Sequence, residues 1–369
     1  MAIKKIKTEA RSFFQTGLAF LLLFCFISCS QKKVTAKETT VVWENKQAVA
    51  LQLSSLKIET SAIDQLKINL HSSAAGTAIL GDYKVDGANV TFQPLIPLTP
   101  NLKYDIYQGE TLIETIEIPL PPGSETPIVT SIFPSKDSVP ENLLKMYFKF
   151  SKPMQEVRSL DFIKVYDLQN DSLVDVFLDL QPELWDKERT RLTLWLDPGR
   201  IKTDLIPNLE KGIPIVQNRE YKVVISPEWK DYSGVPLGKE YHKTLKVGKR
   251  DSNSPVITNW NIKIPQATTK EPMVIRFNEA MDAILATEVI TVYTEDEAIV
   301  NGTFSIENDE KTLLFTPDTA WKKGSYYFVV DAKFEDLAGN NLNRLFDTDL
   351  HAKVTLNQEP FQKRAFTVN

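Results

Sequence analysis

Phe150-Ser-Lys-Pro-Met154 and Phe277-Asn-Glu-Ala-Met281 are two copies of one pattern that lie 127 residues apart in the sequence. Each copy is followed at the same distance by a valine and a tyrosine, Val165-Tyr166 in the first copy and Val292-Tyr293 in the second. A pattern repeated at this distance predicts tandem domains that share one fold. We therefore do not expect an active site within the repeated segments.

A second repeated pattern follows each of these segments. Asp231-Tyr-Ser-Gly234-Val-Pro-Leu237 returns as Asp336-Leu-Ala-Gly339-Asn-Asn-Leu342. The aspartate side chain can cap a turn, and the glycine three residues later can adopt the positive φ that a tight turn requires. We therefore interpret both patterns as structural: a strand, the end of that strand, and a turn.

Apolar and polar residues alternate in the strand that leads into the first pattern. In the first copy, the apolar set is Leu144, Met146, Phe148 and Phe150. The residues between and after them, which form the more polar set, are Lys145, Tyr147, Lys149 and Ser151. A period of two predicts a strand of an antiparallel sheet, with one face on the core and the other in water. Met154 and Met281 are then expected to pack in the core or at its rim, just past the strand.

Two proline-containing seams, 119–127 and 248–255, divide the chain. Because a sandwich domain takes roughly 100 residues, the seams predict three domains in a row. The expected division is a signal peptide (1–28), a lipidated tether (29–40), a divergent first β domain (41–122), a second domain (125–248), a third domain (254–350) and an extended C-terminal tail (351–369).

The middle domain departs from the repeat in one place. In the first and third domains, nine residues separate the proline of Phe92-Gln-Pro94 or Phe315-Thr-Pro317 from a later tyrosine. In the middle domain, 22 residues separate Pro198 from Tyr221. The shared spacing makes the first domain a divergent copy of the repeat. It also identifies 199–220 as a segment that contains a long insertion.

The first residues are typical of a secretory signal peptide. Four Lys and Arg residues precede an apolar run over 17–27, which is too short to span a bilayer. The run ends in Phe26-Ile27-Ser28-Cys29, which resembles a bacterial lipobox, so Cys29 is the predicted lipidation site. An ordinary secretory signal with a chance cysteine is the alternative. Because Cys25 lies inside the run, the mature chain would contain no disulfide.

The two patterns together resemble the SbsA-type bacterial Ig-like domain. The resemblance is good over 125–350, and over 41–122 it covers only the Phe-x-Pro…Tyr half. The whole chain resembles lipoproteins of Bacteroidetes envelopes that carry tandem Ig-like domains. The resemblance implies an all-β fold, three tandem Ig-like antiparallel β-sandwich domains after a lipoprotein signal peptide, and a location in the cell envelope. It supplies no catalytic residue.

Composition and motifs exclude several functions. From Cys29 onward, 39 Lys and Arg stand against 47 Asp and Glu, a net charge of −8, which argues against nucleic acid as a partner. The sequence contains no Gly-x-Ser-x-Gly, Walker A or Gly-x-Gly-x-x-Gly motif. His71, His242 and His351 have no partner at metal-ligand spacing. We therefore expect no enzyme, no cofactor, no catalytic residue and no metal ligand.

Two acidic turns, 295–297 and 307–310, flank the hairpin strand over 298–306. Oxygen-rich turns at the end of a sandwich can hold calcium. Solvated hairpin turns have the same sequence pattern and are far commoner. Calcium binding is therefore an open alternative here, and solvated turns are the expectation.

The sequence favours a non-catalytic envelope lipoprotein that acts as a structural or protein-interaction scaffold. The insertion is the first candidate for a contact surface, because loops that depart from a rigid repeat tend to carry specificity. Trp195, predicted on the strand face opposite the core, Arg200 and Lys202 are the candidate contact residues. The partner would be another envelope protein or a glycan. A glycan-binding lipoprotein of a polysaccharide-uptake system is the alternative function, and an envelope hydrolase is a remote one.

The segment after Cys29 bears on the location. Ser30 replaces the aspartate that retains lipoproteins at the inner membrane, which favours the outer membrane. Gln31-Lys32-Lys33 lacks the acidic residues that surface-exported lipoproteins of this group carry. We therefore expect a protein anchored to the outer membrane by the lipid on Cys29 and facing the periplasm.

Overall fold

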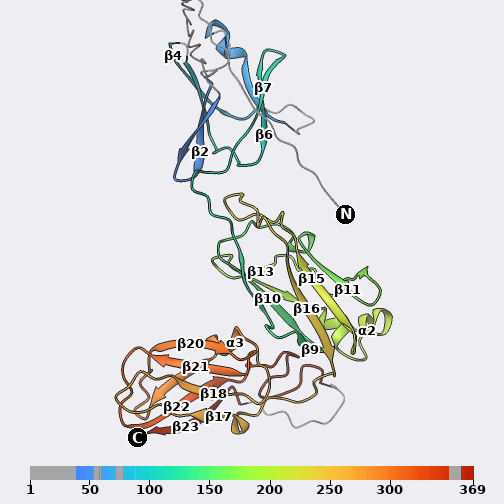
Figure 1. The fold of residues 1–369 in the computed structure, drawn as a ribbon, viewed down its shortest axis with the longest axis vertical. Helices are drawn as coiled ribbons and strands as arrows, with labels where there is room; N and C mark the ends of the chain where they lie inside the picture. Colours follow the sequence, from blue (N-terminus) through green and yellow to red (C-terminus); the bar gives the residue numbers. More distant parts are fainter. Residues whose placement is uncertain (1–38, 54–57, 59, 72–77, 88, 349–358) are drawn as a thin grey trace, which may run out of the picture.

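The computed structural model describes residues 39–53, 58, 60–71, 78–87, 89–348 and 359–369. These residues form three β-sandwich domains that follow one another along the chain (Figure 1). Each domain has its own hydrophobic core, so the predicted all-β fold of tandem sandwiches is confirmed. Cys29 and the leader lie outside the described residues. Within the described ranges, no helix combines the length and the apolar character needed to cross a bilayer.

The first domain packs two antiparallel sheets against each other. One sheet has the order β1 (Thr40–Glu44), β2 (Gln47–Gln52), β5 (Asn89–Pro94) and β4 (Gly81–Asp86). The other has the order β3 (Leu66–Leu70), β6 (Lys103–Gln108) and β7 (Thr111–Glu117). Alternation along the strands buries Phe92 from the first sheet and Ile106 from the second, and neither side chain is exposed to solvent.

The second domain is built on the same plan with more strands. One sheet has the order β13 (Leu184–Trp185), β14 (Arg191–Trp195), β10 (Lys145–Phe150) and β8 (Val129–Phe133). The other has the order β12 (Ser172–Leu173), β11 (Ile163–Asp167), β15 (Glu220–Ile225), β16 (Tyr241–Gly248) and β9 (Ser138–Pro140). The pairing of β9 with β16 is parallel, in contrast to the antiparallel pairing expected throughout. The insertion forms two short helices, α1 (Pro198–Ile201) and α2 (Ile206–Lys211).

The third domain repeats the plan with one short helix, α3 (Leu285–Glu288). One sheet has the order β17 (Asn261–Lys263), β18 (Met273–Arg276), β21 (Thr312–Pro317) and β20 (Gly302–Glu307). The other has the order β19 (Ile290–Thr294), β22 (Gly324–Asp331) and β23 (Phe361–Val368).

The third domain extends to Val368, although the sequence predicts that it ends at 350 and that 351–369 is a tail. Strand β23 pairs with β22 along its whole length, and Phe366 and Val368 belong to the core. The prediction of the boundary is wrong because a connection of 29 residues, 332–360, separates β22 from β23. The equivalent strands of the second domain, β15 and β16, are separated by only 15 residues, 226–240.

The two repeated patterns meet at one end of each sandwich. Met154 forms an isolated antiparallel bridge with Asp231, and Met281 forms the same bridge with Asp336. Both methionines are completely buried, as expected for core residues. The first pattern therefore anchors the turn of the second pattern to its own domain.

The turns themselves are built alike. The Asp231 carboxylate accepts hydrogen bonds from the second and fourth N–H groups that follow it, and the Asp336 carboxylate does the same. Gly234 and Gly339 have φ of +85° and +79°, which a residue with a side chain adopts only with strain. The structural interpretation of this pattern is confirmed.

The face of β10 that alternation assigns to water is covered by the third domain. Tyr147 is only 7% exposed, and the Lys145 side chain is 13% exposed, whereas Lys149 on the same face is open to solvent. Alternation distinguishes the two faces of a strand, but it contains no information about a neighbouring domain. The covered face is the start of the junction between the second and third domains.

Candidate functional site

The junction between the second and third domains brings together the two segments that depart from the repeat. One is the insertion at 199–220, and the other is the long connection at 332–360. Figure 1 shows α2 on the side of the second domain next to this junction. Because the two segments contact each other, the junction is the candidate functional site.

Asp347 of the long connection joins three elements. Its Oδ2 accepts hydrogen bonds from the N–H of Thr203 at 3.1 Å and from the hydroxyl of Thr203 at 3.0 Å. Arg250, in the seam between the domains, donates from Nη2 to the same oxygen at 2.6 Å and to the carbonyl of Ile201 at 2.8 Å. The side chains of Asp347 and Arg250 are 20% and 24% exposed, so this ion pair is screened less than one on an open surface.

Lys202 and Phe346 form a second contact between the same segments. The Lys202 ammonium lies 4.6 Å from the centre of the Phe346 ring, in cation–π geometry. The Phe346 side chain also packs against the hydrophobic core of the second domain. A groove of about 590 Å³ opens here, bounded by 202–205 on one side and by residues of the long connection, including Arg344 and Leu345, on the other.

A group of polar side chains is buried beneath these loops. The Tyr147 hydroxyl donates to Oδ2 of Asp282 at 2.6 Å, and both residues are buried. Lys145 forms ion pairs with Asp282, at 3.5 Å, and with Glu335. Burial raises the pKa of Glu335 above its ordinary value, although the Lys145 ammonium acts in the opposite direction. Desolvation and the Asp282 carboxylate raise the pKa of Tyr147, so its hydroxyl stays protonated as the donor.

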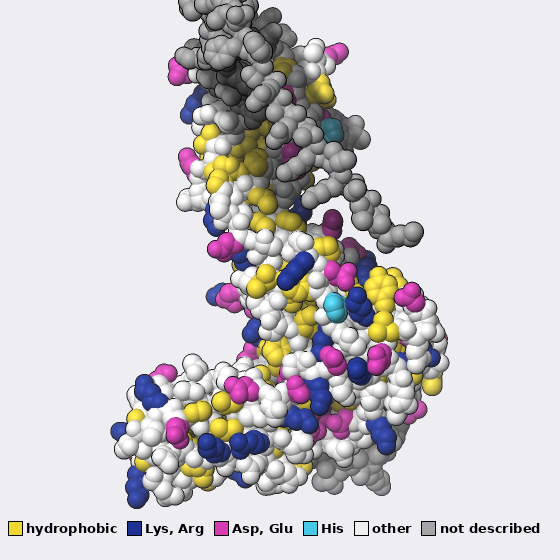
Figure 2. Space-filling model, in the orientation of Figure 1, with side chains coloured by type: hydrophobic (Ala, Val, Ile, Leu, Met, Phe, Trp, Pro, Cys, Tyr) yellow, Lys and Arg dark blue, Asp and Glu magenta, His cyan; other side chains and the backbone are white. Residues whose placement is uncertain are grey.

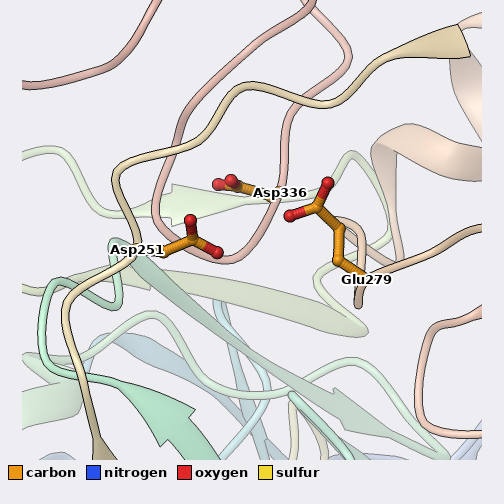
Figure 3. Close-up of side chains that lie close together, drawn as sticks. All are labelled: Asp251, Glu279 and Asp336. Carbon is orange, nitrogen blue, oxygen red and sulfur yellow. The ribbon is translucent and has the colours of Figure 1, made fainter. Parts of the chain in front are cut away.

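Three carboxyl groups meet at the edge of the junction. Asp251 comes from the seam, Glu279 from the first repeated pattern and Asp336 from the second, and Figure 3 shows their side chains converging. One oxygen of each lies within 4.8 Å of one oxygen of both others. Three carboxylate oxygens at this spacing are ligands of the kind that calcium prefers, so these residues could hold a cation. The acidic turns singled out in the sequence contribute no residue to this group.

Ionisation of these buried, neighbouring carboxyl groups is unfavourable when no cation is present. Burial, with help from the Asp251 and Glu279 carboxylates, raises the pKa of Asp336 to about 8. Burial and Asp251 raise the pKa of Glu279 to about 7, although Lys311 acts in the opposite direction. Protons therefore remain on this group at a pH at which isolated carboxyl groups are ionised.

At the equivalent position, the second domain has a lysine in an ion pair instead of a carboxyl group beside other carboxyl groups. Lys152 occupies the position of Glu279 in the first repeated pattern. Its ammonium donates to the carbonyl of Glu125, in the preceding seam, and lies 3.7 Å from the carboxylate of that residue. This position of the repeat thus belongs to a pair of opposite charges in the second domain and to a group of three carboxyl groups in the third.

The predicted contact residues occupy different environments. Arg200 donates hydrogen bonds to the carbonyls of Gly212, Ile213 and Asp175, and thereby holds the insertion together. Lys202 is engaged by Phe346, as described above. Trp195 alternates with the buried Leu194 on β14, but it is partly buried and also packs against the core of the second domain, and the Lys145 ammonium lies 5.2 Å from the centre of its ring. The structure brings Lys202 and Trp195 to the junction, while Arg200 acts within the insertion.

The histidines and acidic turns considered in the sequence analysis, and the buried tryptophans, form no further site among the described residues. His71 pairs with Asp105 at 2.9 Å, His242 is exposed, and His351 lies outside the described residues. Glu310, expected in a solvated turn, is 2% exposed and accepts from the N–H of Ser135 in the second domain. The expectation is wrong for Glu310, which packs against a neighbouring domain, whereas 295–297 and 307–309 are exposed as expected. Trp229, Trp260 and Trp321 are core residues.

Comparisons with known proteins give one family match and a set of weaker structural similarities. The profile of the bacterial Ig-like domain family matches residues 251–351. The S-layer protein rSbsC is similar over 56% of this chain and 23% of its own, with 15% identity and a TM-score of 0.25. A titin tandem of Ig domains is similar over 81% of this chain and 91% of its own, with 13% identity and a TM-score of 0.22.

The chain spans less than half of the S-layer chains that it is similar to, 23% of one and 44% of the other. Comparison with curated protein sequences finds no match. The family match supports a bacterial Ig-like domain at the C-terminal end of the chain. It carries no information about a ligand or a partner.

Proposed function

We propose that this protein is a non-catalytic scaffold of the bacterial cell envelope that holds another envelope protein. The observation that carries the proposal is the junction of the second and third domains, where the insertion and the long connection bind each other. A shared polar and apolar interface makes the two domains one unit. A unit of this kind can present a surface in a fixed orientation, which is the task of a scaffold.

The contact surface is the outward side of the insertion. Helix α2 exposes Ile206 and Leu209, which are 69% and 71% exposed and lie three residues apart on one side of the helix. The contacts of Thr203 and Lys202 with the third domain hold the start of the insertion in place. A protein partner is favoured over an anionic polymer, because the visible face of this unit carries positive and negative side chains mixed together (Figure 2).

The lipid on Cys29 would anchor the scaffold at the outer membrane, on the periplasmic side. The first domain would then stand between the anchor and the unit of the second and third domains. The proposal requires no catalytic residue. The glycan-binding alternative requires an open aromatic platform, whereas Trp195 is covered by Lys145 and the tryptophans named above are buried.

The proposal is tested by crosslinking in cells. A photo-crosslinking residue at Leu209 is expected to capture one envelope protein, and the Ile206→Ser substitution is expected to abolish that adduct. The matched control places the crosslinker at Val157, which is 38% exposed and follows Met154 at the end of the second domain that carries the 231–237 turn. Equal adducts from both positions, or an adduct that survives Ile206→Ser, would show that α2 is not the contact surface.

A further inference from the structure

The turn at 336–342 of the third domain is seated on the second domain. The N–H of Leu144 donates to the carbonyl of Leu337 at 2.9 Å. A Cβ atom placed on Gly339 would clash with Cδ2 of Leu144, so the buried Leu144 side chain would have to shift. Glycine is therefore favoured at this position both for its positive φ and for the close approach of the second domain.

The equivalent turn at 231–237 is seated on the first domain. Nδ2 of Asn101 donates to the carbonyl of Gly234 at 2.7 Å. A Cβ atom placed on Gly234 would lie 3.6 Å from Cβ of Pro100. Gly234 is buried although it lies within a turn at the end of a sandwich. Both turns thus contact the preceding domain, and in both the glycine lies at the contact.

The two contacts differ at the residue that follows the aspartate. Leu337 packs against the hydrophobic core of the second domain and is not part of the core of its own domain. Tyr232, at the same place in the second domain, is 72% exposed. The third domain thus inserts an aliphatic side chain into its neighbour, whereas the second domain does not.

We propose that the Asp-x-x-Gly-x-x-Leu turn is the element by which the second and third domains each dock on the domain before them, and that the residue after the aspartate sets how firmly they dock. The partner of the turn is the end of an Ig-like sandwich that offers an N–H donor beside an aliphatic or proline side chain. The aspartate and the methionine bridge fix the turn from its own domain. The first domain, 41–122, does not contain this sequence pattern.

The firmness of docking is measured with pairs of spin labels in a chain that begins at Ser30 and therefore has no native cysteine. Labels on cysteines at Leu173 and Ile299, both exposed, report the position of the third domain relative to the second. The unmodified turn is expected to give one narrow distance distribution, and Leu337→Ala is expected to broaden it several-fold. Ile264→Ala, an exposed aliphatic residue of the third domain, is the matched control and should leave the distribution narrow.

A narrow distribution in Leu337→Ala would overturn the proposal. A thermal melt followed by tryptophan fluorescence checks that the third domain of this variant is folded. The reverse substitution gives a second test that does not depend on that variant. With labels at Leu112 and Leu173, Tyr232→Leu is expected to narrow the distance distribution between the first and second domains, and an unchanged distribution would contradict the role given to this position.

Discussion

Thr203 and Asp347 are 144 residues apart in the sequence and are joined by two hydrogen bonds to one carboxylate oxygen. Thr203 lies in the insertion of the second domain and Asp347 in the long connection of the third. Neither segment belongs to the repeated plan. The two additions to that plan therefore stabilise each other, which makes the two domains one unit.

Asp347→Ala is expected to release the insertion from the third domain. The substitution removes three hydrogen bonds to a charged acceptor and leaves Arg250 without its carboxylate. A cost of about 2 kcal/mol is expected, which corresponds to roughly 30-fold faster opening. The amide of Thr203, which donates to Asp347, should then exchange its hydrogen about 30-fold faster. Asp296→Ala, in an exposed turn of the third domain, should leave this rate unchanged.

Tyr147→Phe is expected to destabilise the junction by about 1–3 kcal/mol, because it removes the hydroxyl donor to the buried Asp282 carboxylate. Urea unfolding measures the effect. Tyr166→Phe is the control, since Tyr166 lies on β11 of the same domain, away from Asp282. Equal stability of the two variants would show that the bond to Asp282 contributes nothing to the junction.

The repeat made the fold predictable, because each part of it reports a local requirement. Phe150 and Met154 mark a strand and its buried end, and Gly234 marks a turn that needs a positive φ. Such requirements are met by neighbours in the sequence. For this reason the sandwiches, the core role of Met154 and the turns all follow from the pattern.

The junction was not predictable in the same way, because its contacts join residues far apart in the sequence, such as Tyr147 and Asp282, which are 135 positions apart. Tyr147 has the sequence pattern of a solvent-facing residue, and only the docked third domain buries it. Phe366 belongs to the core but was predicted to lie in the C-terminal tail, because the long connection separates β23 from β22. The insertion was visible from its length, but the sequence alone does not reveal that Thr203 faces Asp347.

Cys29→Ser is expected to release the protein from the membrane fraction, because it removes the proposed attachment point of the lipid. Fractionation of cells with detection of the protein measures the change, and metabolic labelling with a fatty acid should lose its signal in parallel. Cys25→Ser, which changes the other cysteine of the leader, is the control and should leave both signals intact. Continued membrane attachment of Cys29→Ser would contradict the lipid anchor.

The stability of the third domain is expected to fall as the pH rises from about 4 to 8. The pKa values of Asp336 and Glu279 in the folded protein, about 8 and about 7, lie above their unfolded values. The folded state therefore binds more protons than the unfolded state in this interval, and its advantage is lost as the pH passes the folded pKa values. Urea unfolding at a series of pH values measures the slope, which should flatten above pH 8.

Glu279→Lys is expected to raise the stability of the third domain at pH 8 and to reduce its dependence on pH. The substitution copies the second domain, where Lys152 pairs with Glu125 of the seam. A lysine at 279 would place a positive charge beside Asp251 and Asp336 and would lower the pKa of Asp336, because a nearby cation favours the ionised carboxylate. Glu279→Gln separates the two effects, since it removes the negative charge without adding a positive one and should give an intermediate stability at pH 8. If Glu279→Lys were less stable than the unmodified chain at pH 8, repulsion among these carboxyl groups would not be what weakens the third domain.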